Sequence, residues 1–231
     1  MPVILAIETA TKLCSVALLR DGQALAVREL ESEKHIHAEK VNVFIDEALR
    51  EASVTMKDLQ AVAVGIGPGS YTGLRIGLSA AKGLCFALDI PIIGLSTLGT
   101  LWQQARQLGS MPEAEHVAHP MIDARRMEVF TQAFAPDGAA LSAVHPLILD
   151  THWPAANELQ HVVFGDGADK AAALWAGNSA IVHLAGVRPT AAAMGAESTR
   201  RFLAKEFDDL AYLVPTYGKA ANVTQPKKRS Q

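Results

Sequence analysis

Residues 65–83 read GIGPGSYTGLRIGLSAAKG, a glycine-dense turn followed by a run of small residues. The preceding residues 61–64 are apolar throughout, which is typical of a strand buried on both faces of a sheet. Glycines in the turn permit positive φ and close approach, and two hydroxyl side chains can cap a helix: Gly65, Gly67, Gly69, Ser70 and Thr72. The stretch predicts a strand, a loop and a helix, and the loop could hold an anion or the backbone of a partner. A tight connection without a ligand explains the same residues, and a Walker loop is excluded because its lysine and following hydroxyl are absent.

The predicted helix carries small residues at every fourth position, which leaves one side almost without side chains. Gly73, Gly77 and Ala81 form this stripe, with Gly83 beside it. Each glycine inside a helix costs roughly 1 kcal/mol relative to alanine, so the stripe requires a packing reason. Packing against the protein's own sheet is one reason, and an interface with another subunit is the other. We predict the interface, formed by Gly73, Leu74, Gly77, Leu78, Ala80 and Ala81, with Val41 and Ile45 from the preceding helix.

The run GPGSYTGLRIG resembles the hallmark of the TsaB (YeaZ) family. Four further stretches support the resemblance over nearly the whole chain: AIETAT at 6–11, IDARRMEVF at 122–130, GDGA at 165–168 and PTY at 215–217. The resemblance implies an α/β, actin-like or sugar-kinase-like (ASKHA) fold, built from duplicated ribonuclease-H-like units in two subdomains. It further implies a non-catalytic subunit that binds and supports TsaD, the catalyst of the threonylcarbamoyladenosine (t6A) modification of adenosine 37 in tRNA. The ATPase TsaE is the expected third partner, and tRNA is met only through the complex.

The order of predicted elements agrees with a duplicated fold, because each half opens with three strands. In the first half, a hairpin turns at Asp21-Gly22, a favoured pair for this turn. We predict strands at residues 3–7, 15–20, 24–30, 61–64, 92–95, 117–123, 127–134, 139–149, 161–164 and 181–184. We predict helices at 37–52, 72–88, 96–109, 170–176 and 190–207, the last with Phe202, Leu203 and Phe207 inward and Arg200, Arg201, Lys205 and Glu206 in water.

A chain of 231 residues, 49% hydrophobic and 19% charged, is long enough for one large or two small domains. We expect an N-terminal subdomain at 1–110, a C-terminal subdomain at 111–214 and a tail at 215–231, because residues 109–115 are polar and contain a proline. The net charge of −3 gives no general case for nucleic-acid binding. We expect the basic run 227–229 to be a solvated end and not a tRNA contact.

The sequence also indicates a cytoplasmic protein without a membrane span. The amino terminus lacks the basic region of a signal peptide, and the apolar stretch 76–95 is interrupted by charged residues and a proline. Cys14 and Cys85 lie among apolar neighbours, as buried thiols in a reducing compartment commonly do.

Two turns resemble the hairpins that hold metal and phosphate in actin-like ATPases. A carboxylate at a strand end is more often solvated or bonded within its turn than a metal ligand, and adjacent arginines can grip an anion or pair locally. The GDGA stretch resembles an adenosine-side loop, although such a turn needs no ligand to explain it. The candidate ligand residues are Glu8, Thr9, Thr11, Gly67, Gly69, Ser70, Thr72, Asp123 and Arg125, with Arg126 beside the last.

The histidines argue against a metal enzyme. His35 with His37, and His116 with His119, are the close pairs, and neither has the i, i+4 spacing that lets two histidines on a helix share one metal. We expect both pairs at the surface or in turns and assign no metal and no catalytic residue.

The leading hypothesis is therefore the non-catalytic TsaD partner, which requires no cofactor, although a nucleotide could bind at the interface of the complex. An ATP-dependent phosphotransferase or weak ATPase using Glu8, Thr9, Thr11 and Asp123 is the alternative, and a metallopeptidase is the third choice. Because an exposed close-approach face tends to be covered, we also predict a homodimer in the absence of TsaD.

Overall fold

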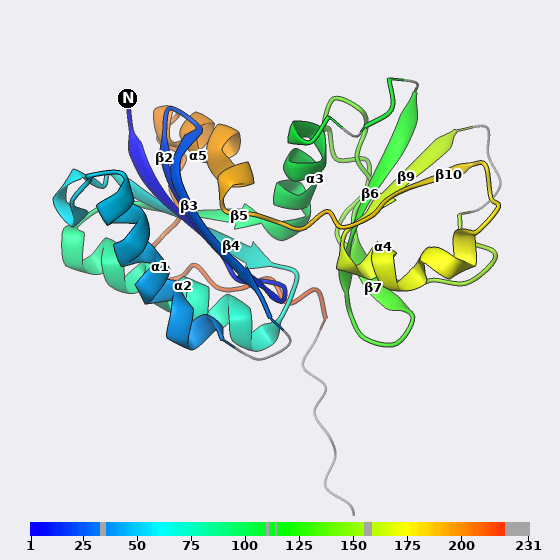
Figure 1. Ribbon diagram of the computed structural model, residues 1–231, viewed down its shortest axis with the longest axis horizontal. Coiled ribbons are helices and arrows are strands. Elements are labelled where there is room, and N and C mark those ends of the chain that lie inside the picture. The colour runs from blue at the N-terminus through cyan, green and yellow to red at the C-terminus, as the bar shows by residue number, and fades with distance from the viewer. Residues whose placement is uncertain (33–35, 110, 114, 155–158, 220–231) are drawn as a thin grey trace, which may run out of the picture.

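The computed structural model describes residues 1–32, 36–109, 111–113, 115–154 and 159–219. Figure 1 shows two lobes, each built on a five-stranded sheet. The first sheet has the order β3-β2-β1-β4-β5. Its strands are β1 (Val3–Glu8), β2 (Leu13–Arg20), β3 (Gln23–Glu31), β4 (Ala61–Gly67) and β5 (Ile92–Ser96). The strands β1 and β4 lie side by side and parallel at its centre. Other elements cover both faces of the sheet there, which explains the apolar runs of both strands.

Two helices, α1 (His37–Glu51) and α2 (Tyr71–Leu88), cover one face of the first sheet. A short 3-10 helix, η1 (Met56–Asp58), precedes β4. The predicted cap is confirmed, because the Ser70 hydroxyl accepts a hydrogen bond from the Gly73 amide at 3.2 Å. The helix ends where Asp89 takes a left-handed conformation, at φ 54°.

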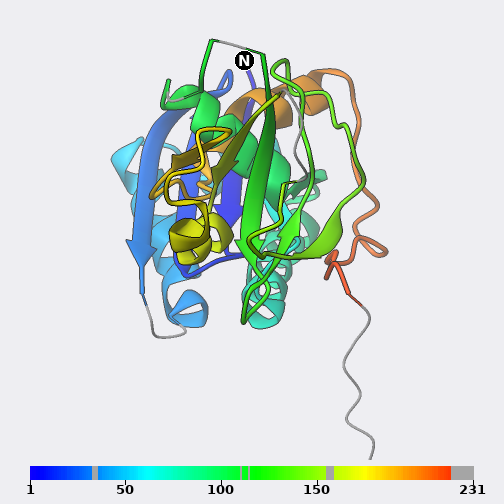
Figure 2. The same ribbon diagram turned by 90° about the vertical axis from the view of Figure 1, so that its right-hand side faces the viewer.

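The second sheet, which faces the viewer in Figure 2, has the order β10-β9-β6-β7-β8. Its strands are β6 (His116–Asp123), β7 (Glu128–Thr131), β8 (His145–Ile148), β9 (Gln160–Phe164) and β10 (Ile181–Leu184). As in the first sheet, three antiparallel strands are extended by two parallel ones. The helix α4 (Asp166–Ala171) and the 3-10 helix η2 (Ala172–Trp175) cover one face.

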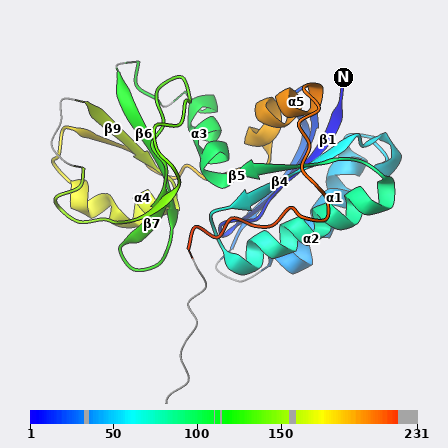
Figure 3. The ribbon, with the colours of Figure 1, turned by 180° about the vertical axis from the view of Figure 1, so that it is seen from behind.

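Each sheet receives its remaining cover from the other half of the chain. The helix α3 (Thr97–Gln107) follows β5, yet its apolar residues pack against Ile122, Phe130 and Phe164 of the second lobe. The 3-10 helix η3 (Ala192–Met194) and α5 (Gly195–Leu203) follow the second sheet but pack on the first. Figure 3 shows α3 beside β6 and α5 beside β1. This exchange ties the two lobes together.

The segment 205–219 returns along the first lobe and ends at the second. The Asp208 amide donates to the Ile92 carbonyl at 3.0 Å, so the segment covers the free edge of β5. Further on, the Thr216 amide donates to Ile66 at 2.7 Å. The segment then reaches the second lobe, where Lys219 forms an ion pair with Glu128. Figure 3 shows this path in orange and red.

Most predicted elements are present, including the hairpin at Asp21-Gly22 and the buried positions of Cys14 and Cys85. The long helix predicted at 190–207 is wrong: α5 ends at Leu203, and Leu203 and Phe207 are exposed. Arg201, expected in water, donates to the Gly94 carbonyl at 2.8 Å. The helix predicted at 170–176 instead begins at Asp166, so the GDGA stretch enters its first turn.

The strands predicted at 127–134 and 139–149 are shorter than expected, at Glu128–Thr131 and His145–Ile148. Within the described ranges, no helix is both long and apolar enough to cross a bilayer. The basic run 227–229 lies outside the described residues.

Candidate functional site

A cleft of about 1170 Å³ lies between the lobes and brings together loops that are distant in sequence. The first lobe contributes the β1–β2 turn, the start of α1 and the turn before α2. The second lobe contributes the β6–β7 hairpin and Asp166, and Lys219 closes one side. Of the candidate ligand residues, those that line the cleft are Thr11, Gly69, Ser70, Thr72, Asp123 and Arg125. Glu8, Thr9 and Gly67 are buried and do not line it.

Glu8 lies at the end of β1 and is fully buried. Its Oε1 accepts a hydrogen bond from the Ala10 amide at 2.8 Å, while its Oε2 has no partner among the described residues. Burial raises the pKa of Glu8 to about 7, because a charged carboxylate is poorly solvated there. Near neutral pH this group is therefore only partly ionised.

The hydroxyls of the β1–β2 turn are already engaged in holding the first lobe together. Thr9 Oγ1 donates to the Gly73 carbonyl at 2.8 Å, and Thr11 Oγ1 accepts from the Leu13 amide at 3.2 Å. The Thr11 carbonyl is bonded to His37 Nε2 at 2.8 Å, which fixes the start of α1 against the turn. These contacts make the turn a structural joint between β1, α1 and α2.

The glycines of the loop before α2 also have reasons within the chain. A side chain at Gly69 would overlap Ala10, whose carbonyl accepts from the Ser70 amide at 2.7 Å. Gly67 has a φ of 111° and lies against the Thr216 carbonyl of the C-terminal segment. Close approach of the chain to itself therefore accounts for both positions.

The β6–β7 hairpin forms the opposite wall. The Asp123 carboxylate accepts from the Arg125 amide at 2.7 Å and forms an ion pair with Lys170. The Asp123 amide donates to Asp166 Oδ1 at 2.9 Å, and burial raises the pKa of Asp166. Arg125 and Arg126 follow with positive φ values of 73° and 50° and are exposed at the tip.

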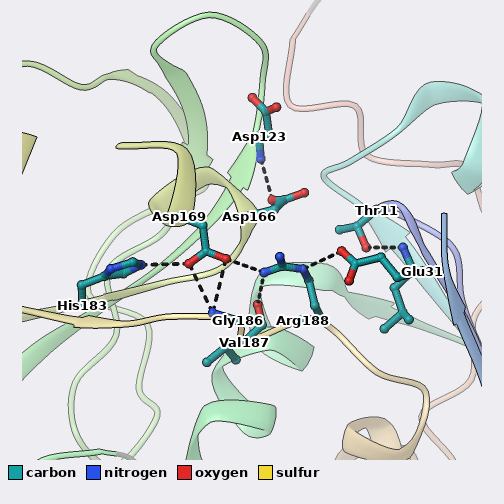
Figure 4. A network of polar contacts seen from close by, with 10 residues as sticks. Thr11, Glu31, Asp123, Asp166, Asp169, His183, Gly186, Val187 and Arg188 are labelled. Atoms are coloured by element: carbon teal, nitrogen blue, oxygen red, sulfur yellow. Dashed lines mark hydrogen bonds and ion pairs between the residues drawn. The ribbon is translucent and has the colours of Figure 1, made fainter. Parts of the chain in front are cut away.

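Figure 4 shows a polar network that connects the lobes beside this cleft. Arg188 Nε donates to Glu31 Oε1 of the first lobe at 3.0 Å, and Arg188 Nη1 donates to Asp169 Oδ2 of the second at 2.6 Å. Asp169 is also bonded to His183 Nε2 at 2.9 Å. Sequence reasoning missed this network, because Glu31 and Arg188 are 157 positions apart and neither lies in a recognisable pattern.

The stripe of small residues on α2 faces the protein's own sheet. A side chain at Gly77 would meet Thr9 and Ile7, and one at Gly73 would meet the Thr9 carbonyl. The expectation of an open face is wrong for Gly73, Leu74, Gly77, Leu78, Ala81, Val41 and Ile45, all of which are buried, and Ala80 is half-buried. The stripe exists because α2 packs closely on the end of β1 and the following turn.

The opposite, outer side of α2 is exposed and partly aromatic. Phe86 is 83% exposed and Tyr71 is 54% exposed. The Arg75 guanidinium lies 4.1 Å from the centre of the Tyr71 ring, and Arg75 Nε donates to Tyr217 Oη at 2.9 Å. The adjacent Tyr212 is 82% exposed. We call these five residues the α2 outer face. In the sequence, this face was indicated by Phe86, a large aromatic residue on the side of the helix opposite the stripe.

The histidines occupy different places from those expected. His37 and His116 are buried, at the start of α1 and in β6, whereas both were expected at the surface or in turns. His119 is half-buried, with its Nε2 3.0 Å from His161 Nδ1, and burial lowers its pKa to about 3. His35 lies outside the described residues. Among the residues that are described, no group of three or more His, Cys, Asp or Glu side chains is placed to hold a metal.

Comparison with known proteins agrees with this architecture. The family model for TsaD, tRNA N6-adenosine threonylcarbamoyltransferase, matches residues 30–152. The tRNA threonylcarbamoyladenosine biosynthesis protein TsaB of Haemophilus influenzae is 39% identical over 127 residues, which are 55% of this chain and 51% of that protein. For TsaB of Escherichia coli the identity is 38% over 134 residues, which are 58% and 55% of the two chains. The matched chain thus spans about half the length of these curated relatives.

Solved structures extend the similarity beyond the matched sequence. YeaZ from Pseudomonas aeruginosa superposes with a TM-score of 0.78 at 25% identity, covering 94% of this chain and 100% of that one. The ASKHA fold is confirmed by this likeness and by the two mixed sheets with their covering helices. Together, the matched family model, the curated relatives and the shared fold show that the chain belongs to the TsaB (YeaZ) family of t6A biosynthesis proteins.

Proposed function

We propose that this chain is a non-catalytic subunit of the t6A-forming complex and that it binds and supports the catalytic subunit TsaD. The contacts of the candidate ligand residues carry the proposal. The groups that would have to hold a metal nucleotide are used within the chain: Thr9 and Thr11 bond to the backbone, and Asp123 pairs with Lys170. The cleft therefore offers a poor site for phosphotransfer, whereas relatives of this chain are described as t6A biosynthesis proteins.

The α2 outer face is the surface we propose for TsaD. Exposed aromatic residues and arginine are the types enriched at binding hot spots, and here Tyr71 and Tyr217 hold the Arg75 guanidinium in place. A side chain fixed before binding loses less conformational entropy when a partner covers it. In the absence of TsaD, the same face would pair with a second copy, which gives the predicted homodimer. TsaE would join the complex as the third component. No cofactor is required, although a nucleotide could bind at the interface of the complex.

The test is copurification of tagged TsaD with this chain, followed by a tRNA modification assay in which each subunit is omitted in turn. We expect copurification and modification with the wild type. Phe86→Ser should lose TsaD binding, because it removes an 83% exposed aromatic ring from the proposed contact. Leu203→Ser is the matched control, since Leu203 is 69% exposed on α5, which packs on the other face of the first sheet.

Two outcomes would contradict the proposal. Retention of TsaD binding by Phe86→Ser, with loss in Leu203→Ser, would move the interface to the other face of the lobe. ATP hydrolysis by the isolated chain that disappears in Asp123→Ala would favour the phosphotransferase alternative.

A further inference from the structure

The tip of the β6–β7 hairpin presents two arginines at the rim of the cleft. Arg125 and Arg126 both line the cleft and both are exposed. Among the described residues, neither guanidinium takes part in an ion pair or a hydrogen bond. Each arginine also has a positive φ, a conformation that costs a non-glycine residue free energy and is retained only where the surroundings hold it. We call this pair the arginine tip.

The acidic groups nearest the arginine tip are engaged elsewhere. The Asp123 carboxylate pairs with Lys170 and accepts a hydrogen bond from the Arg125 amide, so it stabilises the turn. Glu128 pairs with Lys219 of the C-terminal segment. Asp166 is half-buried and accepts the Asp123 amide. The nearby carboxylates are thus bonded to other groups, which leaves the two guanidinium charges at the rim free to attract an anion.

The wall across the cleft from the arginine tip is suited to an anionic ligand that carries aromatic groups. The turn before α2 places Ser70, Tyr71 and Thr72 along the lining, and the first turn of α2 contains no acidic residue. Hydroxyl groups, aromatic rings and arginines are the side chains that proteins use on nucleic-acid backbones and bases. The volume of about 1170 Å³ is larger than most small-ligand sites require.

We propose that the arginine tip contacts the phosphate backbone of the tRNA when this chain is part of the t6A-forming complex; this inference rests on the proposed function. Phosphate fits the planar fork of a guanidinium, which donates two parallel hydrogen bonds to it. A free nucleotide is disfavoured because Thr9 lies outside the cleft, and Thr11 and Asp123, which line it, are already bonded within the chain. RNA fits better because it can be bound from the rim by its phosphates alone.

The experiment measures the affinity of the purified complex for tRNA at several salt concentrations. The variant is Arg125→Gln with Arg126→Gln. It removes both charges and keeps a non-glycine residue at each of the two positive-φ positions. The control is Arg20→Gln with Lys57→Gln, which removes two exposed charges of the first lobe. Arg20 pairs with Val3 at the end of β1 opposite Glu8, far from the cleft. A third variant, with lysine at both tip positions, retains charge but loses the guanidinium fork.

We expect the glutamine variant to bind tRNA several-fold more weakly. The slope of log affinity against log salt should become shallower by roughly 0.7 to 0.9 for each phosphate that the variant no longer neutralises. The lysine variant should keep most of the slope but bind less tightly than the wild type, and the control should match the wild type. All variants should copurify with TsaD to the same extent.

Three results would overturn the inference. One is an unchanged affinity and slope in the glutamine variant. Another is an equal change in the control, which would show a general charge effect. The third is a loss of TsaD or TsaE copurification with tRNA affinity unchanged per complex, which would assign the arginine tip to an acidic protein surface. If the wild-type chain does not copurify with TsaD at all, the proposed function fails instead, and the copurification step shows that outcome before any RNA is added.

Discussion

Glu8 and Gly65 lie on neighbouring parallel strands, and the Glu8 carboxyl rests where a side chain at position 65 would stand. The glycine thus makes room for a buried acid, and no partner among the described residues reaches Glu8 Oε2. The glycine at position 65 therefore allows the Glu8 side chain to be buried, and that burial raises the pKa of the Glu8 carboxyl.

We predict that Glu8→Gln stabilises the protein at alkaline pH. The folded pKa of about 7 lies above the ordinary value of 4.5, so Glu8 retains its proton in the folded state over that interval. The wild type is therefore favoured fully below about pH 4.5 and loses that contribution as the pH rises through 7, by about 3 kcal/mol in total. Urea unfolding at about pH 5 and pH 8 measures the effect. A difference between wild type and variant that is constant with pH would contradict the buried, neutral acid.

His119 gives a slope of the opposite sign. Its folded pKa of about 3 lies below the ordinary 6.5, chiefly because partial burial desolvates the charged ring, and also because positive charge on His161 and His145 would repel it. The unfolded chain takes up this proton first, so stability falls as the pH decreases from 6.5 towards 3. His119→Gln, which can still bond to His161, should reduce the loss between about pH 7 and pH 4 by about 2 to 3 kcal/mol. Acid denaturation curves that coincide for the two proteins would rule this out.

Gly77 and Gly83 lie on the same helix and should respond differently to substitution by leucine. Gly77→Leu should lower stability by about 1–3 kcal/mol or more, because the added atoms meet Thr9 and Ile7. Gly83 has open space around it, so Gly83→Leu should leave the melting temperature unchanged or raise it slightly through helix propensity. Thermal melts of both variants test the pair. A stable Gly77→Leu monomer that no longer binds TsaD would restore the stripe as an interface.

The ion pairs of Arg188 should contribute more to stability than those of an exposed arginine. Arg188 is 24% exposed and joins Glu31 to Asp169 across the lobes. Arg188→Ala should cost about 1–2 kcal/mol, because it leaves two carboxylates without their shared cation. Arg200→Ala is the control and should have a smaller effect, since Arg200 is 52% exposed and pairs with Glu197 and Glu206 at the surface, where water screens the charges. Equal losses in the two variants, measured by urea unfolding, would deny Arg188 a special role.

Local signals in the sequence predicted local structure well. Asp21-Gly22 marked a hairpin and Ser70 marked the start of α2, because turn and cap preferences depend on neighbouring residues alone. The loops that line the cleft were found for a similar reason: they follow strand ends, which meet at one edge of a sheet.

Packing partners were beyond the reach of such signals. The spacing of Gly73 and Gly77 showed that something approaches α2 closely, but periodicity does not say whether the neighbour is Thr9 or another subunit. The partnership of Arg188 with Glu31 depends on the complete fold, as does the burial of His37 against Thr11. Leu203 and Phe207 were placed inward because both fit a helical period, but Leu203 is the last residue of α5 and Phe207 lies beyond it.

The exchange of α3 and α5 leaves neither lobe able to complete its core alone. A fragment that ends near residue 110 would carry α3 with Leu98, Leu101 and Trp102 bared to water, because the sheet that covers them is formed later in the chain. The same fragment would lack Met194 and Phe202, which shield Ile4 and Ile93. During synthesis, nearly the whole chain must therefore leave the ribosome before either core can be completed. Until then, the nascent chain exposes the apolar surfaces of both lobes.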